Sequence, residues 1–359
     1  KSRVGRDDSL AIVWPKPFFV FKEVVMKLAS LRQGRDGALI VVSRDLSTAV
    51  SAASIAPTLQ AALDCWSEAE SSLQALYDKL NAGQAADAFP LGFDTLAAPL
   101  PRSYQFLDGA AYASHITRNR KARGEKLPHD FYDKPLVYQG ISHGFMAWNE
   151  TVPLPSDELG IDFEAEICAI TGDVPMGVSA EDAPSHIKLF VLLNDISLRA
   201  LIPAELKRTF GFLTGKPASS MGPIAVTPDE LGELWDGKLV SGTMKCWVRG
   251  EQVGAIETGT DAPFHYGDLI AHVAQTRNFE PGTLVGLGTV SNNDESAGCA
   301  CIGEIRALEV LRDGVAKTPL FAFGDEIRIE HLDRHGNPVF GRIQQTFVPR
   351  EAVVPAIAQ

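Results

Sequence analysis

The sequence predicts an α+β, β-rich protein with a small N-terminal α+β domain over residues 26–100 and a large second domain over residues 101–350. The chain has 359 residues, which is more than one small domain requires. Residues 81–101 are rich in Ala, Gly and Pro and carry no long periodic face, which is typical of a domain boundary. Beyond Pro101, short apolar runs alternate with turn residues and few helical patterns occur. This texture favours a β-rich roll or barrel over a doubly wound sheet.

The N-terminal elements are expected to be a β-hairpin followed by helices. Two short apolar runs, residues 28–31 and 38–42, flank a polar spacer that contains glycine, as in many hairpins. Apolar residues then recur at helical spacing, first over residues 59–63 and again over 73–80. Residues 1–25 precede a methionine that resembles a native start, so we expect them to be upstream sequence or an addition to the chain.

The second domain is expected to consist mainly of strands. Residues 161–170 alternate between apolar and polar side chains, and residues 189–193 form an apolar run. Residues 243–248 and 327–330 show further strand patterns. The clearest helical pattern covers residues 268–276.

Composition excludes several functional classes. The net charge is −12, and this surplus of acid argues against a nucleic-acid-binding protein, which needs a basic face. No apolar run reaches the roughly 18 residues needed to span a bilayer, so we expect no membrane partner. The 5 cysteines form no CxxC pair, which predicts reduced thiols in a cytoplasmic protein. We expect Cys299 and Cys301 to be small strand residues rather than ligands of a soft metal.

Several acidic residues lie where they can hold a hard cation. If the alternating stretch forms one strand, Asp162, Glu164 and Glu166 share one face, and the two glutamates present oxygen ligands side by side. The alternative interpretation is a solvent-exposed strand face. Asp195 directly follows an apolar run, at a sheet end where ligand-binding groups gather. A helix N-cap or a turn residue would give the same pattern.

A histidine near these acids is a candidate general base. His115 follows Asp108 and stands close to several basic residues. A lone histidine is more often structural. Histidine titrates near neutral pH, however, so one that lies near clustered acids can accept a proton from water.

In their joint order, these segments resemble the fumarylacetoacetate hydrolase family, in the form of its fumarylacetoacetase branch. The resemblance extends over most of residues 101–347, and the N-terminal region is similar to a shortened small domain of that branch. The motifs are, in chain order, Asp108 with His115, Tyr138-Gln139-Gly140, Asp162-Phe163-Glu164-Ala165-Glu166, Asn194-Asp195-Ile196-Ser197-Leu198-Arg199, Gly215-Lys216-Pro217, Met221-Gly222-Pro223, Pro281-Gly282-Thr283 and Gly288-Thr289-Val290-Ser291. Each motif is weak alone, but their order is specific. The resemblance implies a mixed β-roll and β-sandwich catalytic domain and a homodimer.

The resemblance also implies the roles of individual residues. His115 matches the histidine that activates water. Arg199 and Lys216 match basic groups that bind the substrate and its oxyanion, and Tyr138 and Thr289 match positions that contact the substrate. A divalent cation, Mg²⁺ or alternatively Ca²⁺ or Mn²⁺, would be held by Asp108, Glu164, Glu166 and Asp195. Asp162 lies outside this ligand set, so we expect its replacement by Asn to be mild.

Two positions depart from the pattern of the fumarylacetoacetases. Ile202 stands where they have a glutamine, and Ala110 stands where they have a tyrosine. Both positions belong to substrate recognition, so the identity of the substrate stays open.

The glutamate that orients the histidine is a further open position. Alignment on Gly298 places Ile302 there, whereas Glu304 lies two residues on, on the same face of an expected strand. We favour Glu304 as the residue that orients His115.

The resemblance implies a metal-dependent hydrolase that cleaves a C–C bond in a small β-diketo or acylpyruvate-type acid, with a role in aromatic amino acid catabolism. His115 would take a proton from water, while Lys216 and Arg199 would stabilise the tetrahedral oxyanion. Oxygen ligands argue against zinc at the cation site. The first alternative is a decarboxylase of a β-keto acid or a hydratase of a 2-keto-enoic acid, and the second is a non-catalytic ligand-binding relative.

Overall fold

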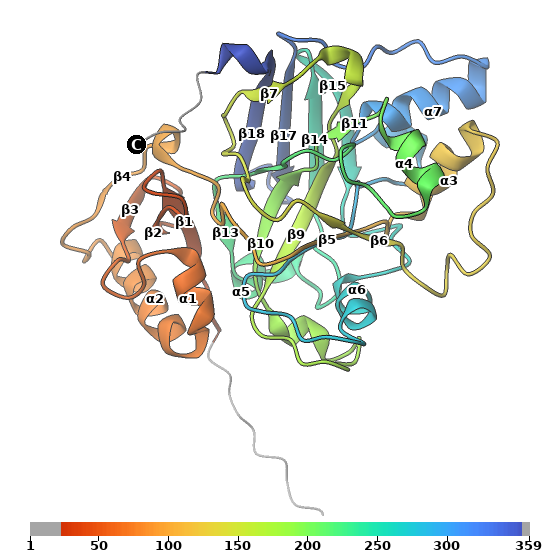
Figure 1. Ribbon diagram of the computed structural model, residues 1–359. Coiled ribbons are helices and arrows are strands. Elements are labelled where there is room, and N and C mark those ends of the chain that lie inside the picture. Colours follow the sequence, from red (N-terminus) through yellow and green to blue (C-terminus); the bar gives the residue numbers. More distant parts are fainter. Residues whose placement is uncertain (1–22, 354–359) are drawn as a thin grey trace, which may run out of the picture.

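The computed structural model describes residues 23–353, in which a small N-terminal domain lies beside a large, strand-rich domain (Figure 1). The predicted α+β, β-rich fold class is confirmed. Within these residues, one sheet of eleven strands runs through both domains in the order β4-β3-β2-β1-β13-β10-β9-β16-β5-β6, with β12 paired to β10. Its strands are β1 (Lys27–Leu31), β2 (Ala38–Val42), β3 (Thr48–Ser51), β4 (Phe89–Pro90), β5 (Phe106–Gly109), β6 (Val137–Gly140), β9 (Ala165–Thr171), β10 (Ile187–Asn194), β12 (Ser220–Met221), β13 (Ala225–Val226) and β16 (Leu284–Gly286).

The N-terminal domain consists of the four strands β1 to β4, which pair in the order β4-β3-β2-β1, and of two helices (Figure 1). β1 and β2 pair antiparallel, which confirms the predicted hairpin. α1 (Leu59–Asp64) begins after Thr58, whose hydroxyl accepts a hydrogen bond from the Ala61 amide and so caps the helix. α2 (Trp66–Asn81) buries Leu73 and Leu80 on its apolar face, as the helical periodicity predicts.

The N-terminal strands continue the sheet of the large domain. β1 pairs antiparallel with β13, with Leu28 opposite Ala225. Leu28 is fully buried in an apolar cluster that also contains Leu73 of α2 and Val191 of β10. Local sequence patterns mark the boundary between the domains but not this pairing, because the partner strand lies far along the chain.

Only the end of the expected N-terminal extension falls within the described residues. There the Val24 amide donates to the carboxylate of Asp229 over 2.6 Å, and the Val25 amide donates to the side chain of Gln74 over 2.7 Å. Residues 1–22 lie outside the described residues.

A second sheet packs on the first in the large domain. Its five strands follow the order β15-β14-β17-β18-β7. They are β7 (Val152–Leu154), β14 (Thr243–Val248), β15 (Glu251–Glu257), β17 (Glu326–Leu332) and β18 (Pro338–Pro349), and a separate pair is formed by β8 (Ile161–Asp162) and β11 (Ser197–Leu198). Apolar side chains of both sheets, such as Phe190 of β10 and Ile329 of β17, join one buried core. The predicted strands at 189–193, 243–248 and 327–330 are confirmed within β10, β14 and β17.

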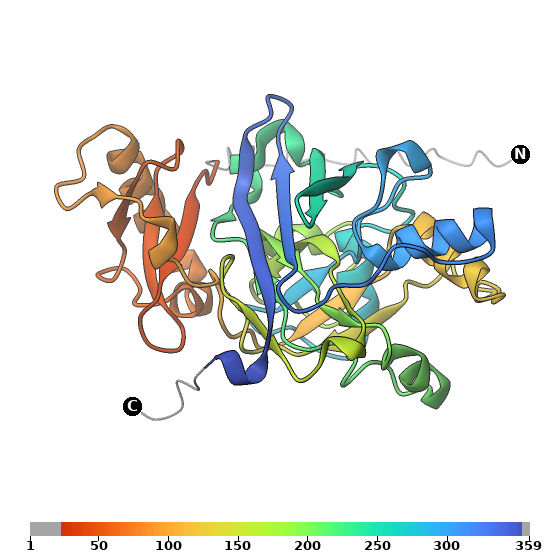
Figure 2. The same cartoon turned by 90° about the horizontal axis from the view of Figure 1, so that it is seen from above.

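Helices cover the ends of the large domain. They are α3 (Ala113–Ala122), α4 (Ile202–Arg208), α5 (Pro228–Leu231), α6 (Tyr266–Val273) and α7 (Ile302–Asp313). α6 confirms the helix predicted near residues 268–276 but begins earlier, because His265 and Asp268 form a capping box at its start. α3 and α7 lie side by side at the end remote from the N-terminal domain (Figure 2).

Two local predictions are wrong. The expected strand at residues 302–304 is the first turn of α7, with Cys301 as its N-cap. Residues 161–170 do not form one strand either, since β8 ends at Asp162 and β9 begins at Ala165. The break between these strands means that the three acidic residues of this stretch do not share one strand face.

Two further features concern the cysteines and the hydropathy of the helices. All five cysteines carry free thiols, and four of them are buried. Among residues 23–353, no helix is both long and apolar enough to cross a lipid bilayer.

Candidate functional site

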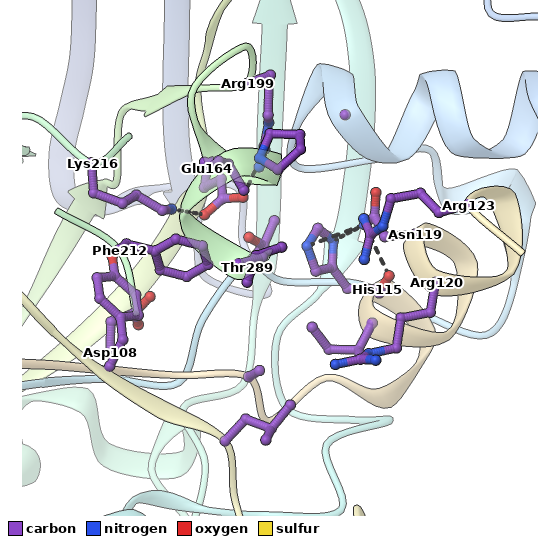
Figure 3. A pocket seen from close by; sticks show the side chains of 18 of the residues that line it. Asp108, His115, Asn119, Arg120, Arg123, Glu164, Arg199, Phe212, Lys216 and Thr289 are labelled. Atoms are coloured by element: carbon purple, nitrogen blue, oxygen red, sulfur yellow. Dashed lines mark hydrogen bonds and ion pairs between the residues drawn. The ribbon is translucent and has the colours of Figure 1, made fainter. Parts of the chain in front are cut away.

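A cavity of about 1150 Å³ opens between the strand ends of the large sheet and helices α3 and α4 (Figure 3). Most of the predicted site residues belong to it. Its lining includes Asp108, His115, Tyr138, Glu164, Arg199, Lys216 and Thr289. The other three, Glu166, Asp195 and Glu304, are buried in contact with these lining residues.

Three of the predicted metal ligands form one compact group. Strand pairing brings them together. β16 lies between β5, which carries Asp108, and β9, which carries Glu166, and Gly286 of β16 is opposite both Asp108 and Cys168. β10, which ends directly before Asp195, pairs with the other side of β9. One carboxylate oxygen from each of three residues lies within 4.8 Å of the others. We call these residues the carboxylate group: Asp108, Glu166 and Asp195.

The carboxylate group is only partly compensated by the protein. Oδ1 of Asp108 and both carboxylate oxygens of Glu166 are buried and have no hydrogen-bond partner among the described residues. Burial raises the pKa of Asp108 and of Glu166 well above the usual range, and the neighbouring carboxylates raise both further. Unpartnered buried oxygens of this kind are costly unless a cation binds them.

Only a glycine at position 286 leaves room for these carboxylate oxygens. A Cβ atom built at this position would lie 2.4 Å from Oδ1 of Asp108 and 3.0 Å from Oε2 of Glu166. Any other residue would therefore collide with the carboxylate group. Hard oxygen donors and orphaned oxygens, which only a glycine can accommodate here, together fit a divalent cation such as Mg²⁺, Mn²⁺ or Ca²⁺.

Glu164, the fourth predicted ligand, lies beside the carboxylate group in an ion-pair network. Its Oε1 accepts a hydrogen bond from Arg199 over 2.7 Å, and its Oε2 accepts one from Lys216 over 2.6 Å (Figure 3). Although burial alone would raise it, the pKa of Glu164 is held below the usual range by the charges of Lys216 and Arg199. Glu164 is thus a carboxylate whose two oxygens are both engaged by the protein.

Asp195 is satisfied by the protein on both of its oxygens. Lys216 and the hydroxyl of Tyr138 each donate to Oδ2 over 2.5 Å, and the hydroxyl of Ser219 donates to Oδ1 over 2.9 Å. Sequence reasoning missed Ser219, which has no distinctive spacing. It also missed Phe212, whose ring meets that of Tyr138 edge to face at 5.0 Å and gives the cavity an apolar wall.

His115 and Glu304 form a hydrogen-bonded pair on α3 and α7. Nδ1 of His115 lies 2.9 Å from Oε2 of Glu304. Glu304 is fully buried, and its other oxygen accepts hydrogen bonds from Arg118 over 2.6 Å and Ser291 over 2.7 Å. Burial raises the pKa of Glu304, but hydrogen bonds from His115, Ser291 and Arg118 bring it below the usual range.

This pairing fixes the tautomer of His115. An ionised Glu304 only accepts hydrogen bonds, so Nδ1 carries the proton and Nε2 keeps its lone pair. The side-chain nitrogen of Asn119, one turn along α3, lies 3.3 Å from Nε2 and can donate to it. The ring is 12% exposed and faces the cavity, with Thr289 between it and Glu164 (Figure 3).

Asp162 connects the two halves of the site. Its carboxylate is fully buried and accepts the backbone N–H groups of Ile302 and Gly303, each over 2.8 Å, at the start of α7. The same carboxylate accepts Nε of Arg199 over 2.8 Å. Asp162 is therefore neither solvent-exposed nor part of the carboxylate group. It ties the helix that carries Glu304 to the arginine that binds Glu164.

Sequence comparisons identify the relatives of this chain. The family model described as fumarylacetoacetate (FAA) hydrolase C-terminal matches residues 105–348, and that described as fumarylacetoacetase N-terminal domain 2 matches residues 26–102. The human mitochondrial oxaloacetate tautomerase FAHD2B is 27% identical over 159 residues, which is 44% of this chain and 48% of that protein. The 2,4-didehydro-3-deoxy-L-rhamnonate hydrolase of Sphingomonas sp. (strain SKA58) is 27% identical over 187 residues, 51% of this chain and 62% of that protein. The chain thus spans about half the length of the curated relatives it matches.

Solved structures show the same fold. The fumarylacetoacetate hydrolase from psychrophilic Exiguobacterium antarcticum aligns with a TM-score of 0.61 and 17% identity, over 90% of this chain and 100% of that one. The maleylpyruvate hydrolase from Sphingobium sp. SYK-6, in complex with manganese(II) and pyruvate, aligns with a TM-score of 0.60 and 17% identity, over 90% and 99%. Because the C-terminal family model covers more than half of its residues, the chain belongs to the fumarylacetoacetate hydrolase family.

Proposed function

We propose that this member of the family is a divalent-metal-dependent hydrolase that cleaves a C–C bond in an acylpyruvate-type or β-diketo acid. One observation carries the proposal: a group of buried carboxylates with orphaned oxygens shares a cavity with a histidine whose tautomer is fixed by a buried glutamate. A decarboxylase would need the carboxylates but not a base for water in this place. The oriented histidine therefore favours a reaction of water over decarboxylation and over non-catalytic binding, while a hydratase, which also adds water, stays an alternative that its product distinguishes.

Asp108, Glu166 and Asp195 would hold the cation, with Mg²⁺ as first choice and Mn²⁺ or Ca²⁺ as alternatives. The Sphingobium maleylpyruvate hydrolase was solved with manganese(II) and pyruvate, which supports such a site in the fold. When bound, the cation would neutralise these carboxylates and polarise the oxygens of a 1,3-dicarbonyl substrate. We keep Glu164 as a fourth candidate ligand, although Arg199 and Lys216 engage both of its oxygens.

The protein side chains would then move the protons. Nε2 of His115 accepts a proton from water, and the Glu304 carboxylate stabilises the imidazolium that forms. The hydroxide attacks the acyl carbonyl, and Lys216 and Arg199 stabilise the negative oxygen. Cleavage of the C–C bond releases a carboxylic acid and an enolate, which regains the proton from His115. Tyr138 and Thr289, which both line the cavity, would contact the substrate.

Keto–enol tautomerisation is the second candidate reaction. Several curated relatives are named oxaloacetate tautomerases, and they match between 44% and 54% of this chain. A histidine with an unprotonated Nε2 can also pass a proton between carbon and oxygen without attack by water. The two reactions differ in their products, so they can be told apart directly.

Three further features stay predictions from the sequence. They are the homodimeric state, the role in aromatic amino acid catabolism and the cytoplasmic location. The location in particular gains no support from the curated relatives, since several are described as mitochondrial.

The first prediction tests the reaction by its products. Incubation of an acylpyruvate with the protein and Mg²⁺ should yield pyruvate and the corresponding carboxylic acid in equal amounts, as mass spectrometry would show. Loss of the ultraviolet band of the diketo acid would follow the same time course. A change in keto–enol ratio without any carboxylic acid would favour the tautomerase, and release of CO₂ would favour the decarboxylase.

The second prediction concerns the cation. Adding Mg²⁺ or Mn²⁺ to chelator-treated protein should restore turnover and raise the melting temperature, because the cation relieves repulsion within the carboxylate group. Glu166→Gln should lose most of this thermal shift, whereas the exposed Glu280→Gln should keep it. Glu164→Gln tests whether Glu164 is a fourth metal ligand. If this variant keeps the metal-induced rise in melting temperature, Glu164 belongs to the ion-pair network alone. Full activity of the metal-free protein would contradict the proposal.

The third prediction concerns the base. His115→Ala should reduce kcat by about 10²–10⁴-fold at saturating metal, because the attacking water loses its proton acceptor. The thermal shift produced by the metal should persist, and His129→Ala, whose side chain is 96% exposed, should behave like the wild type. Glu304→Gln should give a smaller loss, since the histidine remains but is less well oriented. Near-normal C–C hydrolysis by His115→Ala would remove the basis for the general-base mechanism.

The fourth prediction replaces the mild effect first expected at Asp162. An Asn there places an amide group against the donors of Ile302, Gly303 and Arg199, and a lost buried hydrogen bond costs about 1–3 kcal/mol. We expect Asp162→Asn to lower both the free energy of unfolding and kcat, while the metal-induced thermal shift remains. Urea denaturation and steady-state kinetics would measure this, with the exposed Asp173→Asn as the control. A silent Asp162→Asn would show that the link between α7 and Arg199 is dispensable.

A further inference from the structure

A second set of potential metal ligands lies beside the carboxylate group. One ligand atom from each of three residues, His115, Cys301 and Glu304, lies within 4.8 Å of the other two. None of the three belongs to the carboxylate group, so the two sets share no ligand. We call this set the His-Cys-Glu cluster.

The donors of the His-Cys-Glu cluster differ in kind from those of the carboxylate group. They are one nitrogen, one sulfur and one oxygen, a combination that Zn²⁺ binds well and Mg²⁺ does not. Three protein ligands with one side open to water form a common zinc geometry. His115 lines the cavity, and so does Gly303, which stands between Cys301 and Glu304 in the sequence. An ion can therefore reach the cluster from the cavity.

Cys301 stands where a thiolate can be stabilised. It is the N-cap of the twelve-residue helix α7, and its sulfur accepts the backbone N–H of Glu304 over 3.2 Å. The positive end of a helix dipole favours a negative sulfur. Burial nevertheless raises the pKa of the Cys301 thiol well above the usual range, so the sulfur keeps its proton until a soft cation displaces it.

The two arginines near the His-Cys-Glu cluster are already paired with carboxylates. Arg118 is bound to Oε1 of Glu304, so Oε2, which faces His115, is the oxygen available to an ion. Arg199 lies near Cys301 but is already paired with the carboxylates of Asp162 and Glu164. An ion at Oε2 would take the place of the proton now shared between Glu304 and Nδ1 of His115.

We propose that Zn²⁺ binds His115, Cys301 and Glu304 and thereby withdraws the histidine from catalysis. Binding forms three metal–ligand bonds, releases the thiol proton to solvent and moves the Nδ1 proton of His115 to Nε2 by exchange with solvent, without oxidation or reduction. Inhibition by zinc rests on the function proposed above, but binding does not. Sequence reasoning took Cys301 for a small strand residue, because its position at the start of α7 beside His115 is set by tertiary structure.

Cobalt provides a direct probe of this site. Co²⁺ replaces Zn²⁺ in such sites, and its bond to a thiolate gives a near-ultraviolet charge-transfer band. Co²⁺ would be titrated into the full chain in the presence of excess Mg²⁺, which occupies the carboxylate group. Cys301→Ser keeps a hydroxyl N-cap for α7 but lacks the thiolate. Cys299→Ser removes a buried thiol of the same segment that lies outside the cluster and serves as the matched control.

The wild type and Cys299→Ser should show the band, with about one Co²⁺ bound and one proton released per chain. Cys301→Ser should lack the band and bind Zn²⁺ at least about 100-fold more weakly, since even changes around a ligand cost roughly 10–100-fold. The ratio of turnover with and without Zn²⁺, measured within each variant, should be low in the wild type and near one in Cys301→Ser. Circular dichroism would show that each variant is folded.

Two results would overturn the inference: no band in the folded wild type, or an equally strong band in Cys301→Ser. The band and the released proton are read without substrate. Zinc binding in a protein that turns out not to cleave C–C bonds would therefore support the site while removing the proposed function, and the two failures are distinguishable.

Discussion

The burial of three carboxylates side by side is the constraint on which the rest of the site depends. Charges in a low-dielectric interior must be paired, and the protein pairs only one flank of the group. Asp195 receives three donors, whereas Asp108 and Glu166 keep orphaned oxygens that pack closely against Gly286. This asymmetry is what a cation site requires, since full compensation by side chains would leave an ion nothing to bind. Lys216 completes the paired flank: although burial lowers its pKa, Asp195 and Glu164 raise it, so the ammonium stays charged.

The same constraint reaches the histidine through a short chain of contacts. Arg199 compensates Glu164 and is itself held by Asp162, whose carboxylate also accepts the first amides of α7. The first turn of α7 in turn places Glu304 against His115. The ion-pair network is therefore connected, through Asp162, to the helix that holds Glu304 against His115. The two halves of the site are linked by backbone and side-chain hydrogen bonds rather than by their own contact.

Sequence reasoning succeeded where local patterns decide the structure. The hairpin, the helices near residues 59–81 and the buried strand β10 all follow from spacing of apolar residues. The residues that the resemblance assigned to the site do gather around one cavity. The start of α7 was missed because its N-cap is a cysteine and its first two amides are bound by Asp162, a residue distant in the chain. The role of Gly286 was missed because only the approach of two strands makes a side chain impossible there.

The N-terminal domain supports the site without lining it. Among the described residues, the cavity is lined only by the large domain. β1, however, pairs with β13, which follows β12 and the segment that carries Lys216 and Ser219. β12 pairs with the end of β10, where Ser220 lies opposite Asn194, directly before Asp195. The hydroxyl of Thr227, at the end of β13, accepts the Met26 amide at the start of the N-terminal domain. The small domain thus packs along the strands whose ends hold the paired flank of the carboxylate group, so that loss of its packing would loosen Lys216 and Ser219 although none of its own described residues lines the cavity.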